Sequence, residues 1–167
     1  MRIQTARLVL PEYTDDDWRE VLANQSDSRY LRYYAWTGRD AAAVREFIGG
    51  FIAYQHDKPR DVFQLAITLP SNGGQLIGSC GVRVNDRTWR EGNIGYELNP
   101  EYRGNGYATE AARAMLRYGF EDLELHRIWA QLTADNASSA HVLDELGMRH
   151  EATSGNAITS KGAGGTR

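Results

Sequence analysis

Residues 100–111, "PEYRGNGYATEA", constrain the fold most strongly, because the hydrophobic pattern changes across them. Before this segment, apolar residues alternate along residues 63–69, as on a half-buried strand. After it, apolar residues recur at helical spacing over residues 108–119. Gly104 and Gly106 permit the tight backbone turn that such a change needs. The segment therefore predicts a loop that joins the end of a strand to the start of a helix.

The surrounding pattern predicts an α+β fold with a mixed, mostly antiparallel sheet. The turn signals "SNGG" and "NDRTWRE" separate three strand-like runs, "DVFQLAITLP", "QLIGSCGVRV" and "GNIGYELNP", which predict an antiparallel meander. The helix after the loop leads to the strand "HRIWAQLT", and a strand–helix–strand unit implies a right-handed crossover between parallel neighbours. Two further helices are expected after Thr14 and Asp40, and a last one between Asn136 and Gly147.

Composition excludes several classes of protein. A chain of 167 residues with 41% hydrophobic and 25% charged residues fits a single globular domain. The net charge of −3 argues against a nucleic-acid partner, and no apolar run is long enough to predict a membrane span. Cys80 is the only cysteine, so no disulfide can form within the chain, and a cytoplasmic location is expected. The four histidines lack metal-ligand spacing, so no metal is expected.

The glycine loop is a candidate seat for a diphosphate. The first turn of a helix offers backbone N–H groups without partners and a partial positive charge, and Arg103 adds a full charge. A Walker loop is excluded because Tyr107 and Ala108 stand where Lys and Ser or Thr are needed. A dinucleotide fingerprint is excluded because Thr109 stands where Gly or Ala is needed. On spacing alone, a helix entry without any ligand remains the alternative.

Longer stretches carry a resemblance to a known family. "RGNGYA" fits an R/Q-x-x-G-x-G/A loop, and "TARLVL", "IGYELNPEYRGNGYATEA" and "NASSAHVLDELGM" stand around it in family order. Over residues 5–153 the chain resembles the GNAT superfamily of N-acetyltransferases, in its RimJ/RimL-like ribosomal-protein-alanine acetyltransferase branch. The resemblance implies a GNAT fold with a central pair of parallel strands that splay apart and with flanking helices. It also implies acetyl-CoA as cosubstrate and no metal.

The resemblance assigns the cofactor contacts. The pantetheine arm would pair with the backbone of the strand "IGYEL", and the diphosphate would meet the amides that begin at Arg103. Asn136 would contact the pantetheine, and Ser139 would lie near the thioester. The cofactor-binding residues implied in this way are Tyr96, Leu98, Arg103, Gly104, Asn105, Gly106, Tyr107, Ala108, Thr109 and Asn136.

Two side chains are candidates for catalysis. An amine that attacks a thioester must lose a proton, and the departing thiolate must gain one. Glu97 is the candidate proton acceptor, through a water, and the alternative is a solvated strand residue. Many relatives carry an acidic residue just before "IGY", where this chain has Asn93, and that difference leaves the base open. Ser139 is the candidate proton donor to the thiolate, and the alternative is an ordinary first-turn helix residue.

Other conspicuous residues have simpler interpretations. Glu110 is expected to be an exposed helical residue, and Cys80 a buried structural cysteine. The aromatic residues Tyr33, Tyr34 and Trp36 fall where the family shapes its acceptor pocket, although packing between helices explains them equally well.

The last residues depart from the family pattern. We expect residues 1–153 to form the acetyltransferase domain and residues 154–167 to form an atypical glycine-rich tail. The tail lacks periodicity, which predicts disorder, and we hypothesise that it is a frameshifted remnant of the usual ending. The sheet would then lack its usual final strand and expose an edge, which a homodimer would cover. Two functions follow: an N-acetyltransferase acting on a protein N-terminus or a small-molecule amine, or an acyl-CoA-binding module whose catalysis is lost.

Overall fold

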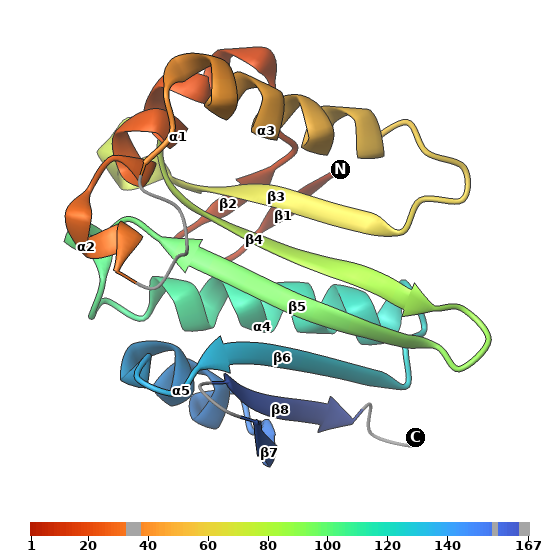
Figure 1. The fold of residues 1–167 in the computed structure, drawn as a ribbon. Helices are drawn as coiled ribbons and strands as arrows, with labels where there is room; N and C mark the ends of the chain where they lie inside the picture. Colours follow the sequence, from red (N-terminus) through yellow and green to blue (C-terminus); the bar gives the residue numbers. More distant parts are fainter. Residues whose placement is uncertain (33–37, 155–156, 164–167) are drawn as a thin grey trace.

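The computed structural model describes residues 1–32, 38–154 and 157–163. Its strands form an eight-stranded sheet in the order β1-β2-β3-β4-β5-β6-β8-β7 (Figure 1). The strands are β1 (Arg2–Gln4), β2 (Val9–Pro11), β3 (Val62–Leu69), β4 (Gln75–Asp86), β5 (Glu91–Leu98), β6 (Arg127–Thr133), β7 (Arg149–Ser154) and β8 (Ala157–Ala163). The helices are α1 (Trp18–Gln25), α2 (Ser28–Leu31), α3 (Ala41–Tyr54), α4 (Tyr107–Glu121) and α5 (Ala137–Glu145).

Helices cover both faces of the sheet and enclose two hydrophobic cores. On one face α4 packs against the central strands, and it passes behind β5 in Figure 1. On the other face α1 and α3 pack together over β3 and β4. The alternation of β3 explains the division, because Leu65 and Ile67 join the core under α4 while Ala66 joins the core under α1 and α3. The predicted α+β architecture is confirmed.

The meander and the crossover form as the sequence predicts. β3, β4 and β5 pair antiparallel in sequence order, and α4 then carries the chain to β6, which runs parallel to β5. The apolar face of α4 is buried, with Ala111, Ala112 and Met115 fully enclosed. The crossover therefore places the glycine loop at the end of β5, directly before α4.

The helix boundaries follow the capping residues. Asp40 accepts a hydrogen bond from the N–H of Ala43 at the start of α3, and Asn136 accepts one from the N–H of Ser139 at the start of α5. Thr14 and Asp17 form a capping box ahead of α1. Gly147 adopts a left-handed φ of 73° just after α5, which ends that helix.

The tail corrects our prediction that the final strand is lost. Residues 157–163 form β8, which pairs antiparallel with β6 on one side and with β7 on the other. β6 is therefore not an exposed edge of the sheet. The prediction failed because it relied on side-chain periodicity and on the family's usual ending, whereas a strand between two partners is held by backbone hydrogen bonds. The frameshift origin of the tail is a hypothesis about the gene, and the nucleotide sequence would test it.

Candidate functional site

The two parallel strands separate and leave a cavity between them. β5 and β6 pair only from Glu91 to Asn93 and from Arg127 to Trp129, although both strands continue. Beyond that point a cavity of about 650 Å³ opens between the strands and the starts of α4 and α5. Its walls include Ile94 to Leu98 of β5 and Ala130 to Thr133 of β6.

Nearly all of the predicted site residues border this one cavity. They come from the end of β5, the glycine loop, the first turn of α4 and the start of α5. Those that border it are Tyr96, Glu97, Leu98, Arg103, Gly104, Gly106, Tyr107, Ala108, Thr109, Asn136 and Ser139.

The glycine loop delivers the first amides of α4 to the cavity. Gly104 and Gly106 both have left-handed φ angles, 78° and 76°, which residues with a Cβ rarely adopt. The first bond of the helix is donated by the N–H of Glu110 to the carbonyl of Gly106. The amides of residues 107–109 therefore have no partner within the helix, which is the arrangement that binds anions.

Two predicted site residues, one in the glycine loop and one in the first turn of α4, use their side chains within the protein. Asn105 does not border the cavity, and its Nδ2 donates to the carbonyl oxygens of Tyr102 and Arg103. Thr109 is 7% exposed, and its hydroxyl donates to Oε2 of Glu145 at 2.7 Å. These residues can contribute backbone groups to a ligand, whereas their side chains hold the loop and α4 in place.

The start of α5 is fixed against β5. The Ser139 N–H donates to Oδ1 of Asn136 at 3.1 Å, and the Tyr96 hydroxyl donates to the Ser139 carbonyl at 2.9 Å. Burial raises the pKa of Tyr96 well above its usual value, so its phenol stays protonated and keeps this bond at neutral pH. The backbone of Ser139 is therefore held on both sides where the residue borders the cavity.

Glu97 is oriented by a tyrosine distant in sequence. The hydroxyl of Tyr30, from α2, donates to Oε2 of Glu97 at 2.6 Å, and both residues border the cavity. Tyr30 is 3% exposed, so this bond is shielded from competing water. The cavity thus combines a partly buried carboxylate, held in one orientation, with a helix start whose first amides have no partner within the helix.

Comparisons with known proteins agree with this geometry. The sequence model of the acetyltransferase (GNAT) domain matches residues 7–149. The chain belongs to the GNAT acetyltransferase family. It is 33% identical over 156 residues to an uncharacterized N-acetyltransferase, YnaD, of Bacillus subtilis, covering 90% of this chain and 84% of that protein. It is 35% identical over 136 residues to the spermidine N(1)-acetyltransferase of Escherichia coli, covering 81% and 69% of the two.

Solved structures of the GNAT family share the fold. One is a RimL ribosomal L7/L12 alpha-N-protein acetyltransferase in complex with coenzyme A, which superposes with a TM-score of 0.83. It covers 98% of both chains at 13% sequence identity, so it supports the fold alone. A second is an acetyltransferase of the GNAT family from Bacillus anthracis, with a TM-score of 0.83, 25% identity and 98% coverage of both chains.

The cavity is also bordered by residues that the sequence did not reveal. Tyr30 lies 67 residues before its partner Glu97, in a helix of four residues with no pattern of its own. His141 and Glu145 lie one turn apart on α5 beside the cavity, with Nε2 of His141 3.5 Å from Oε1 of Glu145. Only the helical spacing of this last pair could have been read from the sequence.

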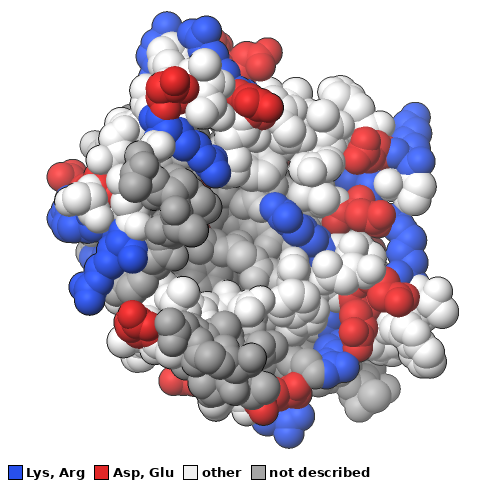
Figure 2. Space-filling view, viewed as in Figure 1, with Lys and Arg blue, Asp and Glu red and all other residues white. Residues whose placement is uncertain are grey.

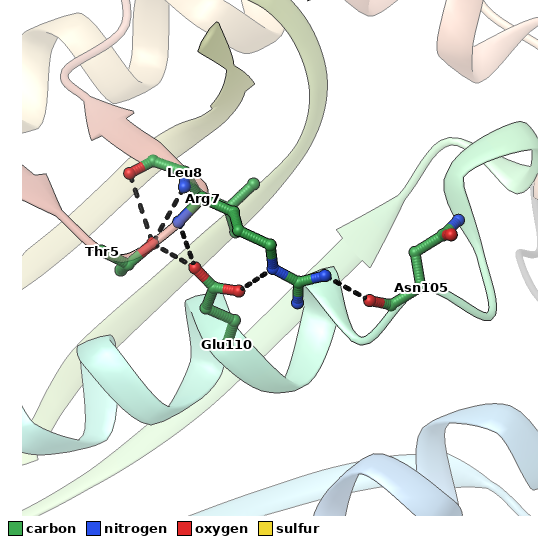
Figure 3. A network of polar contacts seen from close by, with 5 residues as sticks. All are labelled: Thr5, Arg7, Leu8, Asn105 and Glu110. Atoms are coloured by element: carbon green, nitrogen blue, oxygen red, sulfur yellow. Dashed lines mark hydrogen bonds and ion pairs between the residues drawn. The ribbon is translucent and has the colours of Figure 1, made fainter. Parts of the chain in front are cut away.

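Two candidates from the sequence have structural roles. Cys80 is fully buried, and burial raises the pKa of its thiol, so it is the structural cysteine that we expected. Glu110 is not an exposed residue, because Thr5 and Arg7 both hydrogen-bond to its carboxylate (Figure 3). That prediction was wrong because the N-terminal segment covers the helix at this point. The predicted acceptor-pocket residues Tyr33, Tyr34 and Trp36 lie outside the described residues.

Surface charge, helix hydrophobicity and clusters of metal-ligating residue types bear on nucleic-acid, membrane and metal binding. Figure 2 shows a hollow near the middle of one face, with acidic and basic side chains interspersed around it. Within the part of the chain that the structure describes, no helix is long and apolar enough to cross a membrane. Over the same residues, no three His, Cys, Asp or Glu side chains gather as a metal site would require.

Proposed function

We propose that this chain transfers the acetyl group of acetyl-CoA to a primary amine by direct attack. The observation that supports the proposal is a single cavity bordered by an anion-binding helix start and by an oriented carboxylate. The first feature suits the diphosphate of the cofactor, and the second suits removal of a proton from the acceptor.

The proposed cofactor contacts use the backbone more than side chains. Arg103 and the amides of residues 104–109 would hold the diphosphate. The edge of β5 from Ile94 to Leu98, where pairing with β6 has ended, would hydrogen-bond the pantetheine arm as an added strand does. The Oδ1 of Asn136 accepts from Ser139, so the amide nitrogen of Asn136 would donate to a pantetheine carbonyl.

The proposed chemistry assigns one proton to each of two side chains. The amine nitrogen forms a bond to the thioester carbon, and the carbon–sulfur bond then breaks. Glu97 takes the proton that the amine nitrogen loses, through a water, while its hydrogen bond from Tyr30 holds the carboxylate in place. The hydroxyl of Ser139 donates a proton to the departing thiolate and regains one from solvent, while Glu97 releases its proton to solvent. The products are an acetylated amine and free CoA.

The acceptor is proposed as a class. One relative is named for acetylating spermidine, and one protein of the same fold for acetylating the N-terminus of a ribosomal protein. Both acceptors are primary amines, one in a small molecule and one in a protein. We propose a primary amine as the acceptor of this chain as well. An experiment must decide between a small-molecule amine and a protein N-terminus.

A binding assay and an amine screen test the proposal. Acetyl-CoA is expected to raise the thermal unfolding temperature, because a ligand that binds only the folded state stabilises it. Polyamines and peptides with free N-termini are then screened for release of the CoA thiol. Absence of acetyl-CoA binding would overturn the proposal. Binding without thiol release over the whole panel would favour the acyl-CoA-binding module instead.

Two substitutions test the catalytic assignments. Glu97→Gln is expected to lower kcat by roughly 100-fold or more, the usual contribution of a positioned general base. Ser139→Ala is expected to lower kcat less, because water can protonate a thiolate. Glu101→Gln serves as the control, since Glu101 is an exposed glutamate on the turn after β5 and does not border the cavity. Unchanged kcat in Glu97→Gln would show that Glu97 is not the proton acceptor.

A further inference from the structure

A network of polar contacts ties the N-terminal segment to the glycine loop (Figure 3). The Arg7 Nε donates to Oε2 of Glu110 at 2.7 Å, and the backbone N–H of Arg7 donates to Oε1 at 2.8 Å. The Thr5 hydroxyl donates to the same Oε1 at 2.6 Å. Glu110 thus accepts three hydrogen bonds from a segment more than a hundred residues earlier in the chain. The segment between β1 and β2 is fixed against the first turn of α4.

Arg7 extends this network to the loop itself. Its Nη1 donates to the backbone carbonyl of Asn105 at 2.8 Å, and its guanidinium carbon lies 4.7 Å from the centre of the Tyr107 ring. A Cβ added to Gly106 would lie 3.4 Å from Nη2 of Arg7. The arginine therefore packs against residues 105–107. Its Nε bonds to Glu110, and its Nη1 bonds to Asn105. The bond to Glu110 fixes the position of the Arg7 side chain. In that position the guanidinium can also donate to the carbonyl of Asn105.

The carbonyl of Asn105 controls the direction of a loop amide. A trans peptide is planar, so the N–H of Gly106 points opposite to the carbonyl of Asn105 in the same peptide unit. Arg7 holds that carbonyl on its own side of the loop, which turns the Gly106 N–H away from Arg7. Gly106 borders the cavity and Asn105 does not. Because the peptide is followed by a glycine with φ of 76°, rotation of this unit would meet little steric resistance without the arginine.

We propose that Arg7 is a positioning residue that holds the peptide between Asn105 and Gly106 in the orientation that binds the cofactor's diphosphate. In the rotated peptide a carbonyl oxygen would replace an N–H donor at an anion site. Arg7 thus acts on the ligand through the loop backbone, and Glu110 acts as its anchor. The inference rests on the proposed binding of acetyl-CoA at this cavity.

Two acyl donors separate a positioning role from a structural one. Acetyl-CoA carries the diphosphate, whereas S-acetyl-pantetheine has the same thioester and lacks it. Arg7→Gln is expected to raise the KM for acetyl-CoA by roughly tenfold, the size expected when one charge-assisted hydrogen bond is lost. The KM for S-acetyl-pantetheine and the kcat at saturating acetyl-CoA are expected to stay unchanged. Arg7→Lys, which keeps the charge but loses the fork, is expected to restore only part of the affinity.

The control is a second arginine with a matched ion pair. Arg127 has a side-chain exposure of 41%, against 48% for Arg7, and its Nη1 lies 2.8 Å from Oε1 of Glu91. Arg127 does not border the cavity, so Arg127→Gln is expected to leave both KM values unchanged. Equal effects of Arg7→Gln on the two donors, or none on either, would overturn the inference. If the wild-type protein itself fails to bind acetyl-CoA, the proposed function fails first, and isothermal titration distinguishes the two results.

Discussion

At the scale of single residues, Gln25 is a buried side chain whose two polar atoms both lack a partner among the described residues. Its side chain is 1% exposed, and among the described residues neither its amide nitrogen nor its amide oxygen has a hydrogen-bond partner. Burying an unpaired amide costs about 1 to 3 kcal/mol in proteins. Gln25→Met, which keeps a side chain of similar length, is therefore expected to raise the free energy of unfolding by about 1 kcal/mol or more. Urea denaturation measures the change.

Gln64 provides the matched control for this substitution. Its Nε2 donates to the hydroxyl of Ser79, so its amide has the partner that Gln25 lacks. Gln64→Met is expected to lower the free energy of unfolding, because it leaves the Ser79 hydroxyl without its donor. If Gln25→Met also destabilises the protein, the amide of Gln25 is satisfied and the explanation fails.

The residues of the site were predictable where the backbone carries the function. Gly104 and Gly106 were recognised because a left-handed turn before a helix needs glycine, and that need is local. Tyr30 and Arg7 were not recognised, because each acts through a partner 67 or more residues away. The residues next to a tyrosine or arginine in a polar segment do not indicate that it has such a distant partner. Only the folded chain brings the two ends of these bonds together.

At the scale of elements, the contact of the N-terminal segment with α4 predicts a response to acid. Burial alone would raise the pKa of Glu110, but the hydrogen bonds from Thr5 and Arg7 outweigh it, and its pKa lies below the usual value. A carboxylate whose pKa is lowered by folding stabilises the protein above its unfolded pKa, near 4.3 for glutamate. That stability is lost as the pH falls from about 5 through the folded pKa.

Glu110→Gln isolates this contribution. At pH 7 the variant is expected to be less stable than the wild type, and the difference is expected to shrink as the pH falls below about 5. Urea denaturation from pH 7 down to pH 3 measures both proteins. A difference in free energy that stays constant over this range would show that the charge of Glu110 does not stabilise the contact.

The elements themselves were predicted well wherever the side chains repeat or cap. Asp40 and Asn136 marked helix starts because their side chains bond the first amides, and β3 was recognised by its alternation. β8 was missed because the tail has no such alternation and its stability comes from backbone pairing on two sides. A strand that is stabilised by pairing with its neighbours cannot be predicted from the pattern of its own side chains.

At the scale of the whole molecule, β8 pairs with β6 on the side away from β5 and so supports one wall of the cavity. The residues of β6 that border the cavity run from Ala130 to Thr133, and the same residues pair with Ser160 to Ala157 of β8. β6 has turned away from β5 over this length, so β8 provides the backbone pairing that β5 no longer does. We expect this pairing with β8 to hold β6 in its splayed position. We therefore expect the pairing of β6 with β8 to support the acetyl-CoA binding that we propose.

Thr159→Pro tests this dependence. Thr159 pairs with Gln131 of β6 and with Ala152 of β7, and proline inside a strand with two partners removes a ladder hydrogen bond. The variant is expected to lose at least about 1 kcal/mol of unfolding free energy and to bind acetyl-CoA more weakly, as measured by urea denaturation and isothermal titration. Thr159→Val, which keeps the backbone N–H, is expected to change neither. If Thr159→Pro matches the wild type in both measurements, β8 does not support the cavity, and β6 must hold its splayed position without that partner.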